Sequence, residues 1–207
     1  MKKAAVKKGR RADPQKDEAI LESASALFAE RGYGVSIDEI AAAAGVSKQT
    51  IYARYAGKHD LLAAVVHQKA EDLVGSLAQG PGGLTLEAAL TRFGEKLIDL
   101  VFEPRRIAMQ RLIIAEAAQF PDLAERYYES GPAFVREKLS RHIASEARKG
   151  GLEVADPAEA ASMFVGMVFG AEHTAALMGV AQLHTETERR RRVRRAIDAF
   201  LMIYAPK

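Results

Sequence analysis

Apolar residues recur at helical spacing along almost the whole chain, and this periodicity limits the possible folds more than any other feature. Near the N-terminus, one such stripe is formed by Ile20, Ala24, Leu27 and Phe28. Residues three and four apart share one face of an α-helix, whereas a half-buried strand alternates apolar and polar residues. No alternating stretch of useful length occurs in the sequence. We therefore expect an all-α protein of about nine helices.

Helix-capping residues and glycines divide this pattern into separate helices. Pro14 suits the first turn of the first helix, and Gly32 can end that helix in a left-handed conformation. Ser36, with Glu39 three residues later, forms the capping box of a second helix, and Ser47 caps a third. Later helices are expected near residues 58–79, 86–103, 105–119, 121–149, 157–182 and 186–205.

The composition fits a folded protein of the cytoplasm. Hydrophobic residues make up 48% of the 207 residues, which is enough for a full core. The chain has no cysteine, which excludes disulfides and a cysteine nucleophile and fits a reducing compartment. Glu172 and His173 interrupt the longest apolar stretch, 160–183, so we expect a buried helix rather than a membrane span. No apolar region of the kind found in a secretory signal follows the basic N-terminus.

The positive charge of the chain is concentrated at its N-terminal end. Residues 1–60 contain eleven Lys or Arg and eight Asp or Glu, which accounts for the whole net charge of +3. Residues 1–12 contain six of these basic residues and no acidic one. A polyanion, if one binds, should therefore bind at this end. We expect residues 1–13 to form a basic arm that contacts a DNA groove or backbone; the alternative is a solvated tail.

The segment 36–58 has the pattern of a helix-turn-helix. Ala41 and Ala44 are small where two short helices must cross closely, and Gly45 accepts a positive φ angle at the turn between them. Ile51 fills the shared core beneath. This packing fixes the angle of the second helix, whose N-terminal end can then enter a major groove of DNA.

Three exposed residues of that second helix are candidates for contacts with base edges. Lys48 can pair with guanine, Gln49 with adenine, and the Thr50 methyl group can contact a thymine methyl group. The alternative is an ordinary polar helix face. Tyr55, further along, is expected to belong to the core rather than to contact DNA.

Other polar residues of the motif are candidates for phosphate contacts. Tyr52, Arg54 and Lys58 are better placed for the DNA backbone than for bases. The capping hydroxyls of Ser36 and Ser47, at helix N-termini, also suit phosphate oxygens.

Taken in order, these elements resemble the N-terminal domain of TetR/AcrR regulators. The resemblance covers the segment ILESASALFAERGYGVSIDEIAAAAGVSKQTIYARYAGKHDLLAAVV. It includes Phe28 with Gly32-Tyr33, the turn at 40–47, and the aromatic pair at 52 and 55 that precedes Lys58 and Leu61-Leu62. Arg54 and Tyr55 stand where this family often has histidine and phenylalanine. From about 105 to 170, IIAEAAQFPDLAERYYESGP and DPAEAASMFVGMVFG resemble the AefR-like subgroup.

The resemblance implies a homodimer that binds double-stranded, pseudo-palindromic operator DNA, usually as a repressor. It also implies a division into a helix-turn-helix DNA-binding domain at 14–57, a connecting helix at 58–79, and a ligand-binding and dimerisation domain at 84–207. In this family the last two helices pair with their copies across a two-fold axis. The candidate interface residues are Phe164, Val168, Ala171, Val193, Ile197, Phe200, Leu201 and Tyr204. The alternative for these stripes is core within one chain.

Apolar residues with a few polar neighbours predict either an effector pocket or plain core in the C-terminal half. The pocket candidates are Phe93, Leu97, Met109, Leu112, Ile113, Glu116, Phe120, Tyr127, Tyr128, Phe134, Met163, Met167, Phe169 and His173. Glu116 on an apolar stripe must either bind the polar end of a ligand or pair with a cation such as Arg111. The arginine-rich run at 189–195 is expected to be a solvated face that pairs partly with Glu186 and Glu188; the alternative is a second nucleic-acid patch.

The sequence is compatible with three classes of function to different degrees. The sequence favours a DNA-binding transcriptional regulator, a repressor that a small apolar or amphipathic effector releases from its operator. The alternative is an architectural or partner-recruiting DNA-binding protein without an inducer. An enzyme is disfavoured, because the sequence has no nucleophile elbow, no phosphate-binding glycine loop and no paired catalytic carboxylates. No cofactor is expected, and the scattered histidines predict no metal site.

Overall fold

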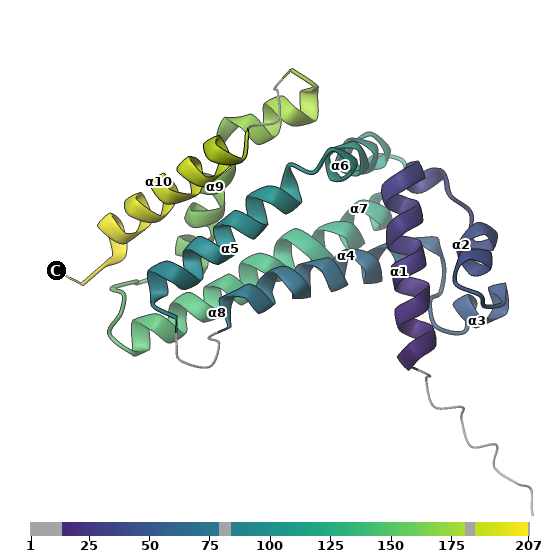
Figure 1. Ribbon diagram of the computed structural model, residues 1–207, viewed down its shortest axis with the longest axis horizontal. Helices are drawn as coiled ribbons and strands as arrows, with labels where there is room; N and C mark the ends of the chain where they lie inside the picture. Colours follow the sequence, from purple (N-terminus) through teal and green to yellow (C-terminus); the bar gives the residue numbers. More distant parts are fainter. Residues whose placement is uncertain (1–13, 79–83, 181–184, 207) are drawn as a thin grey trace, which may run out of the picture.

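The computed structural model describes residues 14–78, 84–180 and 185–206, and within them the chain is helical and contains no strand. This confirms the all-α prediction. The helices are α1 (Pro14–Arg31), α2 (Ile37–Ala43), α3 (Lys48–Tyr52), α4 (Lys58–Val74), α5 (Leu86–Val101), α6 (Pro104–Glu116), α7 (Pro121–Tyr128), α8 (Phe134–Arg148), α9 (Pro157–Met178) and α10 (Glu186–Tyr204) (Figure 1). The basic arm at 1–13 lies outside the described residues.

The segment 121–149, predicted as one helix, is two helices in the structure. A π-helical turn, Glu129–Ala133, separates α7 from α8. Pro132 lies inside this turn and cannot donate the backbone hydrogen bond that a continuous α-helix needs. Gly131 brings the turn against α4, where a Cβ atom would lie 2.8 Å from a methyl carbon of Val66. The turn therefore packs directly against α4.

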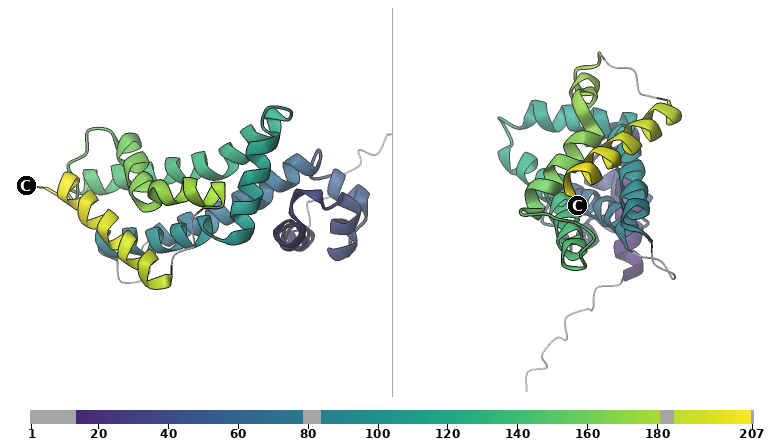
Figure 2. Two further views of the ribbon diagram at one scale, coloured as in Figure 1. Left: turned by 90° about the horizontal axis from the view of Figure 1, so that it is seen from above. Right: turned by 90° about the vertical axis from the view of Figure 1, so that its left-hand side faces the viewer.

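The helices form two parts that α4 connects. α1, α2 and α3 gather at one end of the molecule, and the C-terminus lies at the opposite end (Figures 1 and 2). α4 runs from the first part into a bundle in which it contacts α5 and α8. α9 packs on α8, and α10 packs on α5 and α9. α4 therefore joins the two parts along the chain, and α6 also contacts α1.

Two apolar clusters form the core. The N-terminal cluster consists of Ile20, Ala24, Phe28, Val35, Ile37, Ile40, Ala41, Ile51, Leu61, Leu62, Val65, Val66, Met109, Ile113, Leu123 and Tyr127. The C-terminal cluster is built on Phe93, Leu97, Leu139, Ile143, Phe164, Val168, Val193, Ile197 and Phe200, with the second half of α4. α4 contributes Leu61 to the first cluster and Leu73 to the second, so one helix belongs to both.

α9 is bent at Gly170, where the backbone leaves the helical region with φ 58° and ψ −164°. An L-residue rarely adopts such a conformation, and glycine does so without a side-chain clash. Arg192 of α10 lies beside the bend. Its Nη1 atom donates a hydrogen bond of 3.0 Å to the Phe169 carbonyl, and its guanidinium forms an ion pair with Glu172. The bend is thus held from the neighbouring helix.

Among the described helices, α9 is long and apolar enough to cross a membrane by length and composition alone. The prediction of a buried helix holds for one side of α9 only, since 22% of its most apolar window is buried in the single chain. One stripe, with Ala160, Phe164 and Val168, packs into the C-terminal cluster. Met163 and Met178 of α9 are exposed.

Five predicted interface residues lie in the core of the single chain instead. Phe164, Val168, Val193, Ile197 and Phe200 are each 2% exposed or less and belong to the C-terminal cluster. The most apolar stripes of α9 and α10 face α5 and α8, so these side chains cannot present a surface to another molecule. The other candidates behave differently: Ala171 is exposed, and Leu201 and Tyr204 are half-buried.

Candidate functional site

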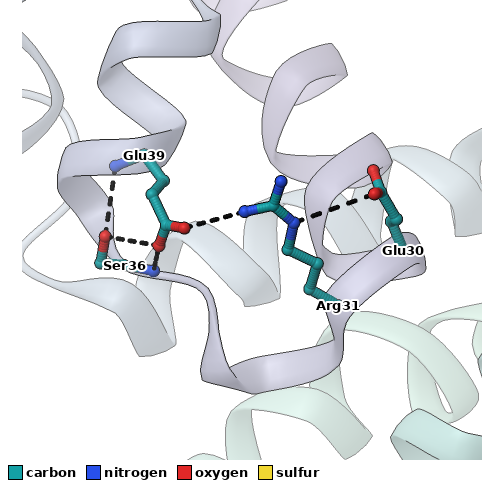
Figure 3. Close-up of polar contacts among 4 residues, drawn as sticks. All are labelled: Glu30, Arg31, Ser36 and Glu39. Atoms are coloured by element: carbon teal, nitrogen blue, oxygen red, sulfur yellow. Dashed lines mark hydrogen bonds and ion pairs between the residues drawn. The ribbon is translucent and has the colours of Figure 1, made fainter.

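A capping box starts the first helix of the helix-turn-helix, as the sequence predicts (Figure 3). The Ser36 hydroxyl accepts a hydrogen bond of 3.2 Å from the Glu39 amide, and the Glu39 carboxylate accepts one of 2.8 Å from the Ser36 amide. Arg31 also donates to Glu39 at 2.9 Å. The Ser36 backbone amide is the main reason that the pKa of Glu39 is lowered. The box fixes where α2 begins relative to α1.

The turn between α2 and α3 is closed by backbone and hydroxyl hydrogen bonds. Gly45 has a φ angle of +64°, as its place in the motif predicts. The Val46 amide donates to the Ala41 carbonyl at 3.0 Å, and the Thr50 amide donates to the Ser47 hydroxyl at 3.1 Å. Ile51 is fully buried beneath both helices. α3 is therefore held at a fixed angle to α2.

The outer face of α3 presents Lys48, Gln49 and Tyr52 to solvent. Tyr52 is 49% exposed although it is a large aromatic residue. Lys48 Nζ lies 2.8 Å from a carboxylate oxygen of Asp38 on α2, and this hydrogen bond raises the pKa of Lys48. Thr50 is half-buried, and its hydroxyl lies 2.9 Å from that of Ser47.

Two of the predicted phosphate-contacting residues already have partners within the protein. The guanidinium of Arg54 is paired with Asp17 on α1 and donates a 3.2 Å hydrogen bond to the Thr50 carbonyl; its side chain is 19% exposed. Lys58 Nζ lies 4.1 Å from the centre of the Tyr33 ring, and burial lowers the pKa of Lys58. Burial also raises the pKa of Tyr33 to about 12. Arg54 thus connects α3 to α1, and Lys58 covers an aromatic ring.

Tyr55 packs against the core, in agreement with its interpretation as a core residue. It is half-buried against the N-terminal cluster, and burial is the main cause of its raised pKa. It therefore faces inward, away from the exposed face of α3.

The acidic partners Asp17 and Asp38 were missed in the sequence, because neither belongs to the helix that carries the candidate DNA contacts. Residues 14–58 contain five Lys or Arg and six Asp or Glu. The positive charge of the N-terminal end therefore lies in the basic arm at 1–13, outside the described residues. Counting charge without the arm would have revealed this distribution.

A cavity of about 240 Å³ lies inside the bundle, among α4, α5, α6, α8 and α9. Four predicted pocket residues line it: Leu97, Tyr127, Phe169 and His173. His173 Nε2 lies 2.9 Å from the Gln110 side-chain oxygen, and burial lowers the pKa of His173. Within the described ranges, no three His, Asp or Glu side chains gather as a metal site requires.

The remaining pocket candidates lie elsewhere. Phe93 is fully buried in the C-terminal cluster, and the residues that pack in or against the N-terminal cluster are Met109, Leu112 and Ile113. Phe120, Tyr128 and Met163 are exposed. Phe134 packs edge-on against His67, and Met167 lines a groove between α9 and α10. α6 turns its most apolar side toward α1, so Met109, Leu112 and Ile113 do not line the cavity.

Glu116 and Arg111 do not pair with each other. Arg111 donates a 2.6 Å hydrogen bond to the Leu177 carbonyl and a second hydrogen bond to the Ala176 carbonyl, at the end of α9. Cations are favourable there because the last carbonyls of a helix lack partners. Glu116 is half-buried near the end of α6 and does not line the cavity.

The polar side of the cavity was missed in the sequence. Arg106 and Gln110 of α6 line it, as does Arg136 of α8. Arg106 and Gln110 are four residues apart and so share a face of α6, next to the apolar face that holds the pocket candidates. A search for polar residues at that spacing would have found them.

In the arginine-rich run of α10, three residues form ion pairs with described carboxylates. Arg189 pairs with Asp99 at 2.7 Å, Arg190 with Glu186, and Arg192 with Glu172. Glu188, the other predicted partner, accepts hydrogen bonds from the amide and hydroxyl of Thr185 in the capping box of α10. Much of this run therefore has structural partners.

Two protein-family models match the chain. Residues 20–65 match the model described as bacterial regulatory proteins, tetR family, and residues 88–206 match the AefR-like transcriptional repressor, C-terminal domain. The HTH-type transcriptional repressor SCO4008 of Streptomyces coelicolor is 33% identical over 144 residues, which cover 65% of this chain and 71% of the relative.

Solved structures show the same fold. A TetR-family transcriptional regulator from Mesorhizobium loti is 27% identical, with a TM-score of 0.77 over 95% of this chain and 100% of the other. The flavonoid-responsive regulator FrrA is 30% identical, with a TM-score of 0.68 over 94% of this chain and 100% of the other.

Proposed function

The chain belongs to the TetR family of DNA-binding transcriptional regulators, with an AefR-like C-terminal domain, and on this premise we propose that it is a repressor that a small molecule releases from its operator. We propose the division made above: a basic arm at 1–13, a DNA-binding domain at 14–57, a connecting helix at 58–79, and a domain for ligand binding and dimerisation at 84–207. The protein acts in the cytoplasm on double-stranded DNA.

The exposed face of α3 carries the proposal for DNA recognition. Lys48 and Gln49 are the candidates for base contacts, since both are exposed at the start of a helix whose angle the capping box and the turn fix. Tyr52 is a candidate for a phosphate contact. Ser36 and Ser47 lie at the same surface as caps. Arg54 and Lys58 contribute by holding α3 and Tyr33 in place, with any phosphate contact secondary.

The open side of α9 and the end of α10 support a dimer. Met163 on α9 and Met202 and Ile203 on α10 are exposed, and such residues favour burial against another copy. A symmetric dimer presents two DNA-binding domains to one palindromic site. For helix-turn-helix dimers the spacing of half-sites is roughly 34–36 Å or a multiple of it.

The cavity supports regulation by an effector. A solid bundle would favour an architectural protein without an inducer, whereas a space lined by apolar residues with a few polar groups suits a ligand. α4 lines this cavity through Val66 and also packs in the N-terminal cluster. An effector that prefers one arrangement of α4 changes the separation of the two DNA-binding domains, by no more than its differential affinity allows. The FrrA relative responds to flavonoids.

Selection of bound sites from a random DNA library tests the proposal. We expect the selected sequence to be two-fold symmetric. The Gln49→Ala variant should lose the preference for one base pair in each half-site, and this preference should be worth about 1–3 kcal/mol of binding free energy. Lys96→Ala, a change of an exposed lysine on α5, is the matched control and should leave the preference unchanged. Selection of no sequence at all would contradict the proposal.

A further inference from the structure

The cavity in the bundle is positively charged. Arg106 and Arg136 line it, and no Asp or Glu of the described residues does. The third basic residue of the lining, His173, is half-buried. Because burial lowers its pKa, His173 is uncharged near neutral pH. The charge of the cavity therefore comes from the two arginines.

Neither arginine has a carboxylate partner among the described residues. Arg136 donates a hydrogen bond to the Tyr128 hydroxyl, and its guanidinium carbon lies 5.3 Å from the centre of the Tyr128 ring. Arg106 forms no ion pair and no side-chain hydrogen bond with any residue of the described ranges. Most of the other half-buried arginines, such as Arg54 and Arg192, do have an acidic partner.

Four acidic residues line a neighbouring space instead. Glu18, Glu22, Asp72 and Glu103 belong to a groove of about 580 Å³ between α1, α4 and α6. Arg106 lines both this groove and the cavity, and none of the groove's carboxylates forms an ion pair with it. A partly buried cation without a partner is costly, and a bound anion removes that cost.

The rest of the cavity is apolar and small. Leu73, Leu97 and Val165 form part of its wall, and Phe169 adds an aromatic face whose ring centre lies 5.3 Å from that of His173. Its volume of about 240 Å³ is below the roughly 300–1,000 Å³ of sites for drug-sized ligands. Gln110 supplies a further polar group beside His173.

We infer that the effector is a small amphipathic anion, an aromatic or short aliphatic carboxylic acid whose carboxylate binds Arg106 and Arg136 while its apolar part lies against the wall of the cavity. This inference rests on the proposed role of the cavity as the effector site. Arginine suits a carboxylate because its planar donors match both oxygens. Arg106 connects such a ligand to the groove beside α1, and hence to the DNA-binding domain.

Titration calorimetry on the full-length protein tests this chemistry with defined probes. The probes are 2-naphthoate and octanoate, each compared with its uncharged carboxamide. We expect each acid to bind at least about tenfold more tightly than its amide, because only the acid forms charge-assisted hydrogen bonds. Arg106→Gln and Arg136→Gln should each weaken binding of the acid by at least about fivefold and leave that of the amide unchanged.

Arg105→Gln is the matched control, since Arg105 precedes Arg106, is exposed, and lines the groove but not the cavity. Equal affinities of acid and amide in the unaltered protein would overturn the inference, and this comparison needs no variant to fold. Acid binding that survives in both arginine variants would do the same, as would no saturable binding of either acid below about 1 mM. Operator affinity is measured in parallel: acids that bind as expected but leave it unchanged would refute the release mechanism and leave the ligand class standing.

Discussion

At the scale of single residues, the candidate DNA surface is a set of cations most of which have partners within the protein. The sequence identified Lys48, Arg54 and Lys58 correctly as cations near one helix, but it did not show what holds them. Asp17 and Asp38 come from α1 and α2, and their distance along the chain conceals the pairing. Residue type and spacing within a helix are readable from sequence, whereas contacts between helices depend on how the helices pack.

Asp38→Asn should strengthen DNA binding. The ion pair of Asp38 with Lys48 is exposed and contributes little to folding, so the melting temperature should change little. Removal of the carboxylate frees Lys48 and removes repulsion of phosphates. We expect several-fold higher affinity at low salt, measured by fluorescence anisotropy, and a smaller gain at high salt. Unchanged or weaker binding would show that Lys48 does not act at the DNA surface.

Arg54→Gln and Asp17→Asn should have similar effects on stability. Their partly buried pair lies between the limits for exposed and buried ion pairs, so each change should lower the free energy of unfolding by about 1–2 kcal/mol. The double variant should lose less than the sum, as denaturant titration can measure. If Arg54 instead mainly contacts phosphate, Arg54→Gln would reduce DNA affinity far more than Asp17→Asn does.

At the scale of helices, caps and terminal glycines were predictable because they act locally. The start of α2 at the Ser36 box and the left-handed glycines at 32 and 45 follow from residue type alone. The break between α7 and α8 and the bend in α9 were not predicted. Each depends on contacts with a neighbouring helix, α4 at Gly131 and α10 at Gly170. The local sequence alone therefore does not determine these irregularities.

Gly170→Ala should destabilise the protein by about 1–3 kcal/mol, because alanine does not tolerate the backbone conformation of the bend. Its Cβ atom would also collide with Arg192 Nη1. Gly166→Ala is the matched control on the same helix, where a Cβ atom meets nothing within 4 Å. That change should stabilise the helix by roughly 0.5–1 kcal/mol. Thermal unfolding measures the stability of both variants. Equal changes in stability would mean that α9 is straight in solution.

The capping box should make folding depend on pH through Glu39. Because the folded-state pKa of Glu39 is lowered, its contribution to stability is complete above the pKa of the unfolded chain and is lost as pH falls through the folded value. Glu39→Gln should therefore melt below the unaltered protein at pH 7, with the gap closing toward pH 3. Glu125→Gln, an exposed change on α7, is the control. If the difference in melting temperature stays constant across this pH range, the charged form of Glu39 is not the source of the stabilisation.

At the scale of the whole molecule, the sequence predicted an apolar stripe on each of the last two helices, with a dimer interface or the core of one chain as its role. Within the single chain, most of these residues belong to the core. The stripes face the core of their own chain, and more scattered apolar residues such as Met163, Met202 and Ile203 remain outside. Periodicity shows that a face is apolar, but it does not show whether the same chain covers that face.

Met163→Glu should therefore shift the protein toward monomers. Met163 is 39% exposed on α9, and its sulfur lies 3.1 Å from the Tyr204 hydroxyl of α10. In a two-fold symmetric dimer both copies of the new glutamate would be buried in the interface. We therefore expect the dissociation constant of the dimer to rise by about a hundredfold. Sedimentation equilibrium measures it. Ile114→Glu, at a 61% exposed residue of α6, should leave it unchanged. An equal shift in both variants would place the interface elsewhere.

The place of α4 in both apolar clusters limits how this protein can exchange parts with its relatives. Leu61, Leu62, Val65 and Val66 of α4 pack with α1 and α2, and the same cluster includes Met109 and Leu123 from beyond the connecting helix. A chimera joined at residue 57 would separate these groups and expose apolar surface at the seam. New operator specificity is therefore better grafted as single substitutions on the outside of α3 than by transplanting the N-terminal domain as a block.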